Sequence, residues 1–225
     1  MAPFLVIIGW ILSAQNLYMR CVIQTDSRRN NEMVQQSQLS LREMAYAEKS
    51  KYLNVECNAG NKPRALIAGC TLCDFIVYVD TDAVWTGISG VFDATSNLIN
   101  SSQVSILAGI DYPETMKVTR SEHKSGFYPG LFNNGILALR CTKITRDILE
   151  QWRWLLERLH EDQRALQEMA EPQSVFHANI KYDFMTLGVY SKYIHHFPGA
   201  YKNQFKYTRH SKFMAPRQTI RCPTL

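Results

Sequence analysis

Short apolar runs recur along the chain, each bounded by polar residues or by glycine and proline. They are rich in β-branched and aromatic residues, which is typical of strands buried in a parallel sheet. The pattern predicts strands over Pro3–Leu12, Tyr52–Val55, Phe75–Val79, Val104–Ala108, Gly135–Leu139 and Tyr193–Phe197.

Between these runs, apolar positions follow a helical period. Large apolar residues recur at three- and four-residue intervals over Ile144–Leu159, which predicts an amphipathic helix that Gln163–Met169 continues or restarts. Asn31–Lys51 and Lys62–Cys70 also favour helices, whereas the polar stretch Asp111–Pro129 is typical of a loop. The alternation of strands and helices predicts an α/β fold with a mostly parallel central sheet flanked by helices.

Length and composition narrow the class of protein. The chain has 225 residues, of which 46% are hydrophobic and 20% are charged. This balance excludes a mainly disordered or fibrous chain and suits one domain. No apolar run reaches the roughly 18–20 residues that a bilayer span requires, so we expect no membrane span in this chain.

The net charge of +5 is concentrated near the C-terminus. No acidic residue follows Asp183, whereas seven lysines and arginines do. This basic C-terminal region could contact phosphates, an acidic surface or only water. We divide the chain into a domain over residues 1–205 and a basic tail over residues 206–225. The charge falls short of that of a dedicated nucleic-acid binder, so we expect no nucleic-acid partner, and polyanion binding by the tail is the least favoured function.

The six cysteines are too few for a disulfide scaffold in a chain of this length. Cys70 and Cys73 form a C-x-x-C motif, but no second pair lies at the spacing of a zinc site. We interpret both as core cysteines, in preference to a redox or metal-binding pair.

Two features concern the compartment. Pro3–Leu12 could also be the hydrophobic part of a signal peptide, but no basic segment precedes it, and we favour the strand. Asn100-Ser101-Ser102 is an N-glycosylation motif, which matters only if the chain enters a secretory lumen.

An acidic pair follows one of the predicted strands. Asp80 and Asp82 come directly after Phe75–Val79, with Thr81 between them. Ligands of open α/β sheets bind beyond the carboxyl ends of the strands, and two carboxylates there can hold Mg²⁺ or Mn²⁺. The alternative is a pair of turn-forming aspartates, although carboxylates at a sheet end are costly unless they are solvated, paired or metal-bound.

Two enzyme families place Asp-x-Asp at this point. Asp80-Thr81-Asp82-Ala83-Val84 resembles the first motif of haloacid-dehalogenase-like phosphatases, which implies Asp80 as nucleophile and Asp82 as acid/base. That family also needs a downstream acidic pair for Mg²⁺ and carries its motif on the first strand, and this chain departs from it on both points. The phosphatase is therefore the alternative hypothesis.

The broader resemblance is to nucleotide-sugar glycosyltransferases of the GT-A fold. Cys73–Trp85 (CDFIVYVDTDAVW) resembles their strand with the Asp-x-Asp motif, and Phe132–Arg140 (FNNGILALR) is similar to the strand that follows it. Asp162-Gln163 resembles the start of the next helix, and Ile194–Lys202 (IHHFPGAYK) resembles an element of glycogenin-type enzymes. The passage around Ala45-Tyr46-Ala47 is similar to one in the galactosyl/mannosyltransferase family that includes xyloglucan xylosyltransferases.

These segments occur in the family order along the chain. The resemblance therefore implies a single GT-A domain that moves a hexose or pentose from a nucleoside-diphosphate sugar to a hydroxyl of a glycan or glycoprotein acceptor. It also implies that Asp80, Asp82 and His196 hold the metal ion, with Asp82 the more direct ligand. Mn²⁺ is favoured over Mg²⁺ because an imidazole is among the ligands. The adjacent His195 is the competing residue, and the family register selects His196.

The same resemblance places residues around the donor. Gly199 would let the backbone approach the diphosphate, and Lys202 would neutralise the departing phosphate. The remaining implied donor-binding residues are Thr81, Lys62, Asp111, Gly135 and Gln163.

Asn134 and Asp162 are the implied catalytic residues. Asn134 would face the donor or acceptor sugar, and Asp162 would face the reacting sugar or the acceptor hydroxyl. The alternatives are a turn at Asn134-Gly135 and a helix N-cap at Asp162. The families with the most similar motifs are retaining, which favours retention, whereas Asp162 acting as a general base would indicate inversion. The compartment stays open: the Golgi lumen for an excised eukaryotic catalytic domain, and the cytoplasm otherwise.

Overall fold

The computed structural model describes residues 18–25, 31–57, 61–110, 132–170, 180–182, 192–197, 202 and 205–222. The helices are α1 (Glu32–Ala47), α2 (Lys62–Gly69), α3 (Val91–Ser102), α5 (Lys143–Leu159) and α6 (Asp162–Ala170). The strands are β1 (Arg20–Gln24), β2 (Lys51–Glu56), β3 (Phe75–Val79), β4 (Ala83–Trp85), β5 (Ile106–Ile110), β6 (Phe132–Arg140), β7 (Ile180–Tyr182), β8 (Ile194–His196) and β9 (Arg217–Arg221). The predicted strand Pro3–Leu12 and the predicted loop Asp111–Pro129 lie outside the described residues.

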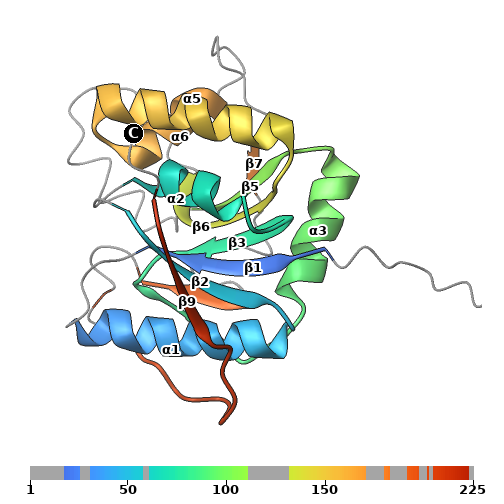
Figure 1. Cartoon of the computed structure of the whole chain (residues 1–225), viewed down its shortest axis with the longest axis vertical. Helices are drawn as coiled ribbons and strands as arrows, with labels where there is room; N and C mark the ends of the chain where they lie inside the picture. Colours follow the sequence, from blue (N-terminus) through green and yellow to red (C-terminus); the bar gives the residue numbers. More distant parts are fainter. Residues whose placement is uncertain are drawn as a thin grey trace, which may run out of the picture.

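The central sheet has seven strands in the described ranges, in the order β7-β5-β6-β3-β1-β2-β9 (Figure 1). The strands β3, β1, β2 and β9 run parallel to one another, and β5 runs parallel to β7. Only β6 runs against its neighbours β5 and β3 in this part of the chain. The sheet is therefore mostly parallel, as predicted. β4 and β8 form a separate antiparallel pair.

Helices cover both faces of the sheet (Figure 1). On one face α2, α5 and α6 enclose a core in which Leu66 and Trp152 are fully buried. On the other face α1 and α3 enclose a second core around Met44 and Phe92. The strand β3 is buried along its whole length between the two layers, which explains its uninterrupted apolar sequence.

Most of the predicted elements are present in the described ranges. The predicted runs correspond to β2, β3, β5, β6 and β8, and the helical segments to α1, α2, α5 and α6. The hydrophobic pattern missed β1, β4, α3, β7 and β9. No helix in the described part of the chain has both the length and the apolar character that crossing a membrane requires.

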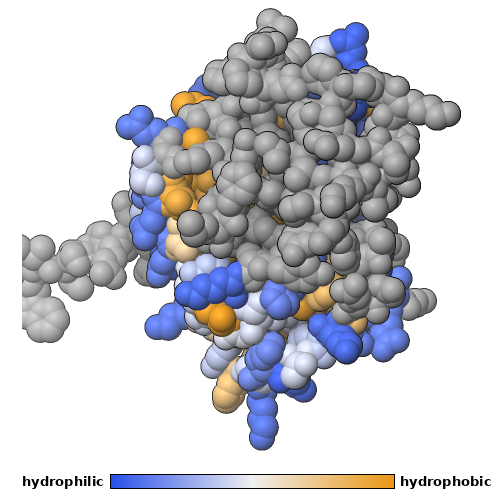
Figure 2. Space-filling view, turned by 180° about the vertical axis from the view of Figure 1, so that it is seen from behind, coloured by the Kyte–Doolittle hydropathy of each residue, from blue (hydrophilic) through white to orange (hydrophobic). Residues whose placement is uncertain are grey.

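The C-terminal segment packs against the domain. β9 lies within the predicted tail and pairs in parallel with β2 at the edge of the sheet. Before it, the backbone N–H of Ala215 donates to the carbonyl of Arg42 in α1, and the guanidinium of Arg209 lies 3.4 Å from the buried carboxylate of Glu43. Seen from behind, the lower end of the molecule mixes hydrophilic side chains with small hydrophobic patches (Figure 2). The division of the chain at residue 205 stays a prediction.

All six cysteines lie in the described ranges, and they form three disulfides: Cys21–Cys73, Cys70–Cys141 and Cys57–Cys222. Cys70 and Cys73 are buried in the core, as interpreted, but each is bonded to another cysteine, which the sequence analysis did not predict.

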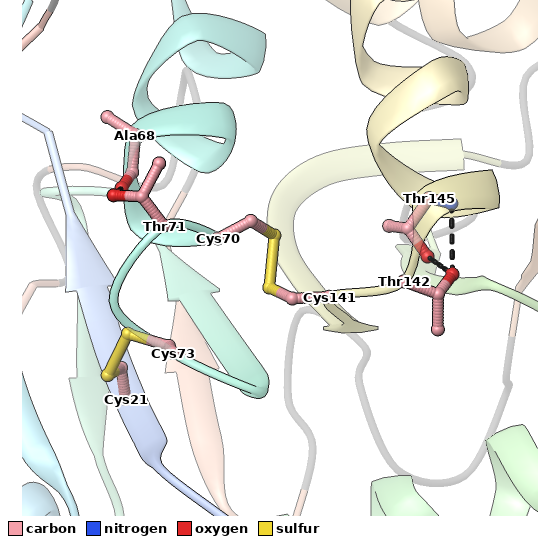
Figure 3. Close-up of a disulfide and its surroundings, with 8 residues drawn as sticks. All are labelled: Cys21, Ala68, Cys70, Thr71, Cys73, Cys141, Thr142 and Thr145. Carbon is pink, nitrogen blue, oxygen red and sulfur yellow. Dashed lines mark hydrogen bonds between the residues drawn. A yellow bond between two sulfur atoms is a disulfide. The ribbon is translucent and has the colours of Figure 1, made fainter.

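The two cysteines of the C-x-x-C motif bond to different partners (Figure 3). Cys70, at the end of α2, reaches Cys141 just after β6, and Cys73 reaches Cys21 in β1. Their spacing gave no sign of this, because which cysteines meet depends on strand order.

Candidate active site

The acidic pair lies at the carboxyl end of β3, as predicted. Asp80 follows β3 directly, and its backbone N–H donates to the carbonyl of Gly135 in β6 over 2.7 Å. The side-chain amide of Gln24, which is fully buried in β1, donates to the carbonyl of Asp80 over 3.2 Å. Asp82 immediately precedes β4. Hydrogen bonds from two neighbouring strands therefore fix the backbone from which the carboxylates project.

The strand β8 brings His196 to this pair. β8 is antiparallel to β4 and places His196 opposite Ala83, while the N–H of Phe197 donates to the carbonyl of Asp82 over 2.8 Å. The imidazole of His196 is buried, and its Nε2 lies 3.0 Å from Oδ1 of Asp82. One ligand atom each of Asp80, Asp82 and His196 lies within 4.8 Å of the others. His195, the predicted competitor, is not in this group.

Gly135 makes room for the imidazole. A Cβ at this position would collide with Cε1 of His196 and lie 2.6 Å from its Nε2. The register of β6 against β5 also shifts between Asn133 and Leu137, as in a β-bulge, and bulges beside active sites re-aim side chains. Asn134-Gly135 therefore belongs to an irregular part of β6 and not to the turn considered as the alternative.

Lys62 links residues that are far apart in sequence. Its Nζ lies 2.9 Å from Oδ2 of Asp80, 3.2 Å from Oδ2 of Asp162 and 2.8 Å from Oδ1 of Asn134. The helix dipole disfavours a positive charge in the first turn of a helix, where Lys62 lies. The three acceptors offset this unfavourable interaction at the start of α2. Burial lowers the pKa of Lys62, but the charges of Asp80 and Asp162 outweigh it, and the pKa is raised. The ammonium therefore stays charged at neutral pH.

Tyr78 is a site residue that sequence reasoning missed. Its hydroxyl donates to Oδ1 of Asp80 over 2.7 Å, so both oxygens of this carboxylate accept a hydrogen bond. Burial and then the charge of Asp80 raise the pKa of Tyr78 well above its usual value, which keeps the phenol protonated. The available signal was a tyrosine two residues before Asp80, because alternate residues of a strand share a face.

The surroundings of Asp82 keep it ionised. Nζ of Lys202, a half-exposed residue, lies 3.6 Å from Oδ2 of Asp82. Burial acts to raise the pKa of Asp82, but the hydrogen bond with His196 and the charges of His196 and Lys202 lower it below its usual value. An ionised carboxylate beside an imidazole is a donor set that a divalent cation such as Mn²⁺ can use.

The other predicted residues are found in different places. Asp162 is the first residue of α6, and its carboxylate faces Lys62 while its carbonyl accepts from Nε1 of Trp152 over 2.9 Å. Gln163 follows it on α6, and Thr81 is buried between the two aspartates.

Asn134 is nearly fully buried, and its Nδ2 makes no hydrogen bond within the described part of the chain. Asp111 and Gly199 lie outside the described residues.

Comparison with solved structures identifies the fold. A glycosyltransferase involved in the glycosylation of the major capsid of PBCV-1 matches over 83% of this chain and 96% of its own, with a TM-score of 0.54 at 9% identity. The galactosyltransferase LgtC in complex with donor and acceptor sugar analogues matches over 81% and 88%, with a TM-score of 0.48 at 16% identity.

A mannosyltransferase from Pyrobaculum calidifontis, in complex with GDP-Man and Mn²⁺, matches over 74% of this chain and 55% of its own, with a TM-score of 0.43 at 14% identity. No protein-family model and no curated protein matches the sequence. The match to the PBCV-1 capsid glycosyltransferase shows that the chain has the GT-A glycosyltransferase fold.

Proposed function

We propose that the protein is a metal-dependent glycosyltransferase that moves a sugar from a nucleoside-diphosphate sugar to a hydroxyl of a glycan or glycoprotein, with retention of configuration. The observation that carries this proposal is the convergence of Asp80, Asp82 and His196 within 4.8 Å, on a fold shared with a glycosyltransferase. The group lies at the carboxyl end of a mostly parallel sheet, where open α/β folds bind ligands.

The donor set fits a divalent cation. Two carboxylates and one imidazole suit Mn²⁺, and the lowered pKa of Asp82 keeps one ligand anionic at neutral pH. Within the described cluster, three carboxylates (Asp80, Asp82 and Asp162) lie beside two ammonium groups (Lys62 and Lys202), so the carboxylates outnumber the lysines by one. Asp82 also contacts the imidazole of His196. When bound, the cation would neutralise negative charge that develops on the diphosphate leaving group.

Lys202 would hold the diphosphate from the side of Asp82. Its ammonium is half exposed and can turn from the carboxylate to a phosphate oxygen without desolvation of a buried charge. Gly199 belongs to the same proposal, since a glycine lets the backbone come close to a phosphate. Lys202 would raise the rate of transfer because negative charge grows on the leaving group during the reaction. A cation placed there stabilises the transition state more than the ground state.

Asn134 and Asp162 would orient the sugars. The buried Nδ2 of Asn134 has no protein acceptor in the described ranges, and a sugar hydroxyl or phosphate oxygen would satisfy it. One oxygen of Asp162 is paired with Lys62, which leaves the other to accept from a hydroxyl. This pairing supports a positioning role in preference to a general base, and with it retention.

A binding experiment tests the proposal. Thermal shift and calorimetry with a panel of nucleoside-diphosphate sugars should detect one class that binds only with Mn²⁺ or Mg²⁺. The double variant Asp82→Asn, His196→Gln should lose roughly 100-fold or more of this affinity, since even residues that only support metal ligands cost 10–100-fold. The matched control is Asp147→Asn, His160→Gln, which changes the same residue types on α5 and at its C-terminal end.

Two outcomes would contradict the proposal. Unchanged metal-dependent binding in the Asp82, His196 double variant would remove the site assignment. A phospho-aspartate trapped at Asp80 would replace the enzyme class by the phosphatase, although both oxygens of Asp80 already accept hydrogen bonds from Tyr78 and Lys62. NMR of the product's anomeric configuration decides between retention and inversion.

A further inference from the structure

The three disulfides indicate the kind of compartment in which this chain folds. No cysteine is left over, and the Cα–Cα separations of 5.1 to 6.1 Å lie in the range that disulfides require. Cysteines of a reduced protein have no reason to fall into pairs, whereas disulfides form and persist in oxidising compartments such as the lumen of the secretory pathway. In such a compartment an N-glycosylation motif becomes meaningful.

The motif Asn100-Ser101-Ser102 lies in the last turn of α3. Asn100 is exposed, and its Oδ1 accepts a hydrogen bond from the guanidinium of Arg140 over 2.8 Å. That bond uses the amide oxygen and leaves the Nδ2 group, the atom that glycosylation modifies, without a partner in the described ranges. The amide is therefore oriented with its reactive nitrogen free.

We propose that Asn100 carries an N-linked glycan, added as the chain enters an oxidising secretory lumen. In this step Nδ2 of Asn100 attacks C1 of a lipid-diphosphate-linked oligosaccharide, the C1–O bond to the diphosphate breaks, and Nδ2 loses one proton. The lipid diphosphate leaves with the bonding electron pair, and no oxidation state changes. The product keeps the amide oxygen, so the hydrogen bond from Arg140 is retained.

The glycan would lie far from the proposed active site. Asn100 contacts Arg140, which pairs with Phe75 at the start of β3, whereas Asp80 follows the end of that strand. Five strand residues span about 16 Å at ~3.3 Å per residue. Asn100 also lines a hollow of about 310 Å³ together with Arg20 and Arg140. The inference does not depend on the proposed function.

The experiment uses the full chain behind a cleavable secretion leader in yeast or insect cells. The secreted protein should show no free thiols, and peptide N-glycosidase should remove one glycan and leave an aspartate in place of Asn100, detected by mass spectrometry of the peptide. Asn100→Gln and Ser102→Ala should each abolish the glycan, because both residues belong to the motif. Asn97→Gln, at an exposed position earlier on α3, should leave it in place.

Secreted protein with all three disulfides and an unmodified Asn100 would overturn the assignment. A glycan that persists in Ser102→Ala would also overturn it. Protein that folds in a reducing cytosol with six free thiols and the same free energy of unfolding would remove the compartment argument. None of these results depends on metal or donor binding, so the proposed function can fail or hold separately.

Discussion

The two ends of the central strands β1 and β3 are stabilised by different means. At the amino end of β1 and β3, two disulfides link elements covalently: Cys21–Cys73 and Cys70–Cys141. At the carboxyl end of β3, partly buried charges crowd together around Asp80 and Lys62. Burying charges costs free energy even when they are paired. The comparison teaches that around these central strands the fold separates the part that supplies stability from the part that holds reactive groups. The third disulfide, Cys57–Cys222, lies at the carboxyl ends of β2 and β9, at the edge of the sheet.

The largest expected effect comes from the amino end. Replacing Cys70 and Cys141 by serine removes a link across 71 residues and should lower the free energy of unfolding by about 4 kcal/mol on the chain-entropy estimate. Urea denaturation measures the loss. Metal-dependent donor binding, followed by calorimetry, should stay within about twofold of the parent, because the bond lies at the other end of the sheet. A large loss of binding would break the comparison.

The next effect comes from the carboxyl end. Lys62→Met leaves the carboxylates of Asp80 and Asp162 without their shared ammonium, which should cost about 3 kcal/mol of unfolding free energy. Mn²⁺ should restore part of the loss, because a cation supplies the missing charge. The control is Lys143→Met, whose exposed pair with Asp147 should contribute less than about 1 kcal/mol. An equal loss in both variants would contradict the buried cluster.

A pair of glycine variants separates packing from chemistry. Gly135→Ala places a methyl group against the ring of His196 and should cost about 1–3 kcal/mol, with a fall of roughly tenfold in metal affinity. Gly69→Ala presses on Ile23 and Ile76 in the core and should cost a similar amount, with metal affinity unchanged. Denaturation and metal titration measure the two effects. Equal metal affinity in both variants would show that His196 is not a ligand.

The smallest effect concerns the phenol of Tyr207, which belongs to neither of these two regions. Burial and a hydrogen bond to Glu43 raise the pKa of Tyr207 from 10.0 to about 12. The unfolded chain therefore loses this proton first, so the contribution of Tyr207 to stability is complete below pH 10 and is lost as the pH rises through about 12. Denaturation of the parent and of Tyr207→Phe across this interval measures it, and the parent should lose more stability. Parallel curves would mean that Tyr207 is not held by Glu43.

Much of the sheet could be predicted because its strands are buried on both faces. The run Phe75–Val79 is apolar throughout for that reason, and Ile144–Leu159 shows the helical period of one buried face. The strand β9, by contrast, has the sequence RQTIR and is largely exposed, so nothing local distinguishes it from a tail. Its strand conformation comes from pairing with β2, a long-range contact. The helix α3 was missed because it is rich in serine and asparagine, which are poor helix formers.

The site residues also divide into those that local sequence predicts and those that long-range pairing brings in. Asp80 and Asp82 could be placed at the end of a strand from local pattern alone. His196 is 114 residues from Asp82, and only the resemblance to a known family brought it there, since the pairing of β4 with β8 has no local signal. The disulfide pairings had neither a local pattern nor a family resemblance to indicate them. Six cysteines allow fifteen pairings, and the spacing of Cys70 and Cys73 favours none of them.

The strand β9 also fixes the order in which the protein can be completed. Of the seven sheet strands, it is the last to be synthesised, and Cys222 follows Cys57 by 165 residues. During translation Cys57 therefore waits as a thiol while the other four cysteines already have their partners on the nascent chain. Until β9 arrives, β2 is an open edge that offers its backbone to any other strand. A chain stopped before residue 217 would keep both an unpaired Cys57 and an exposed strand edge at β2.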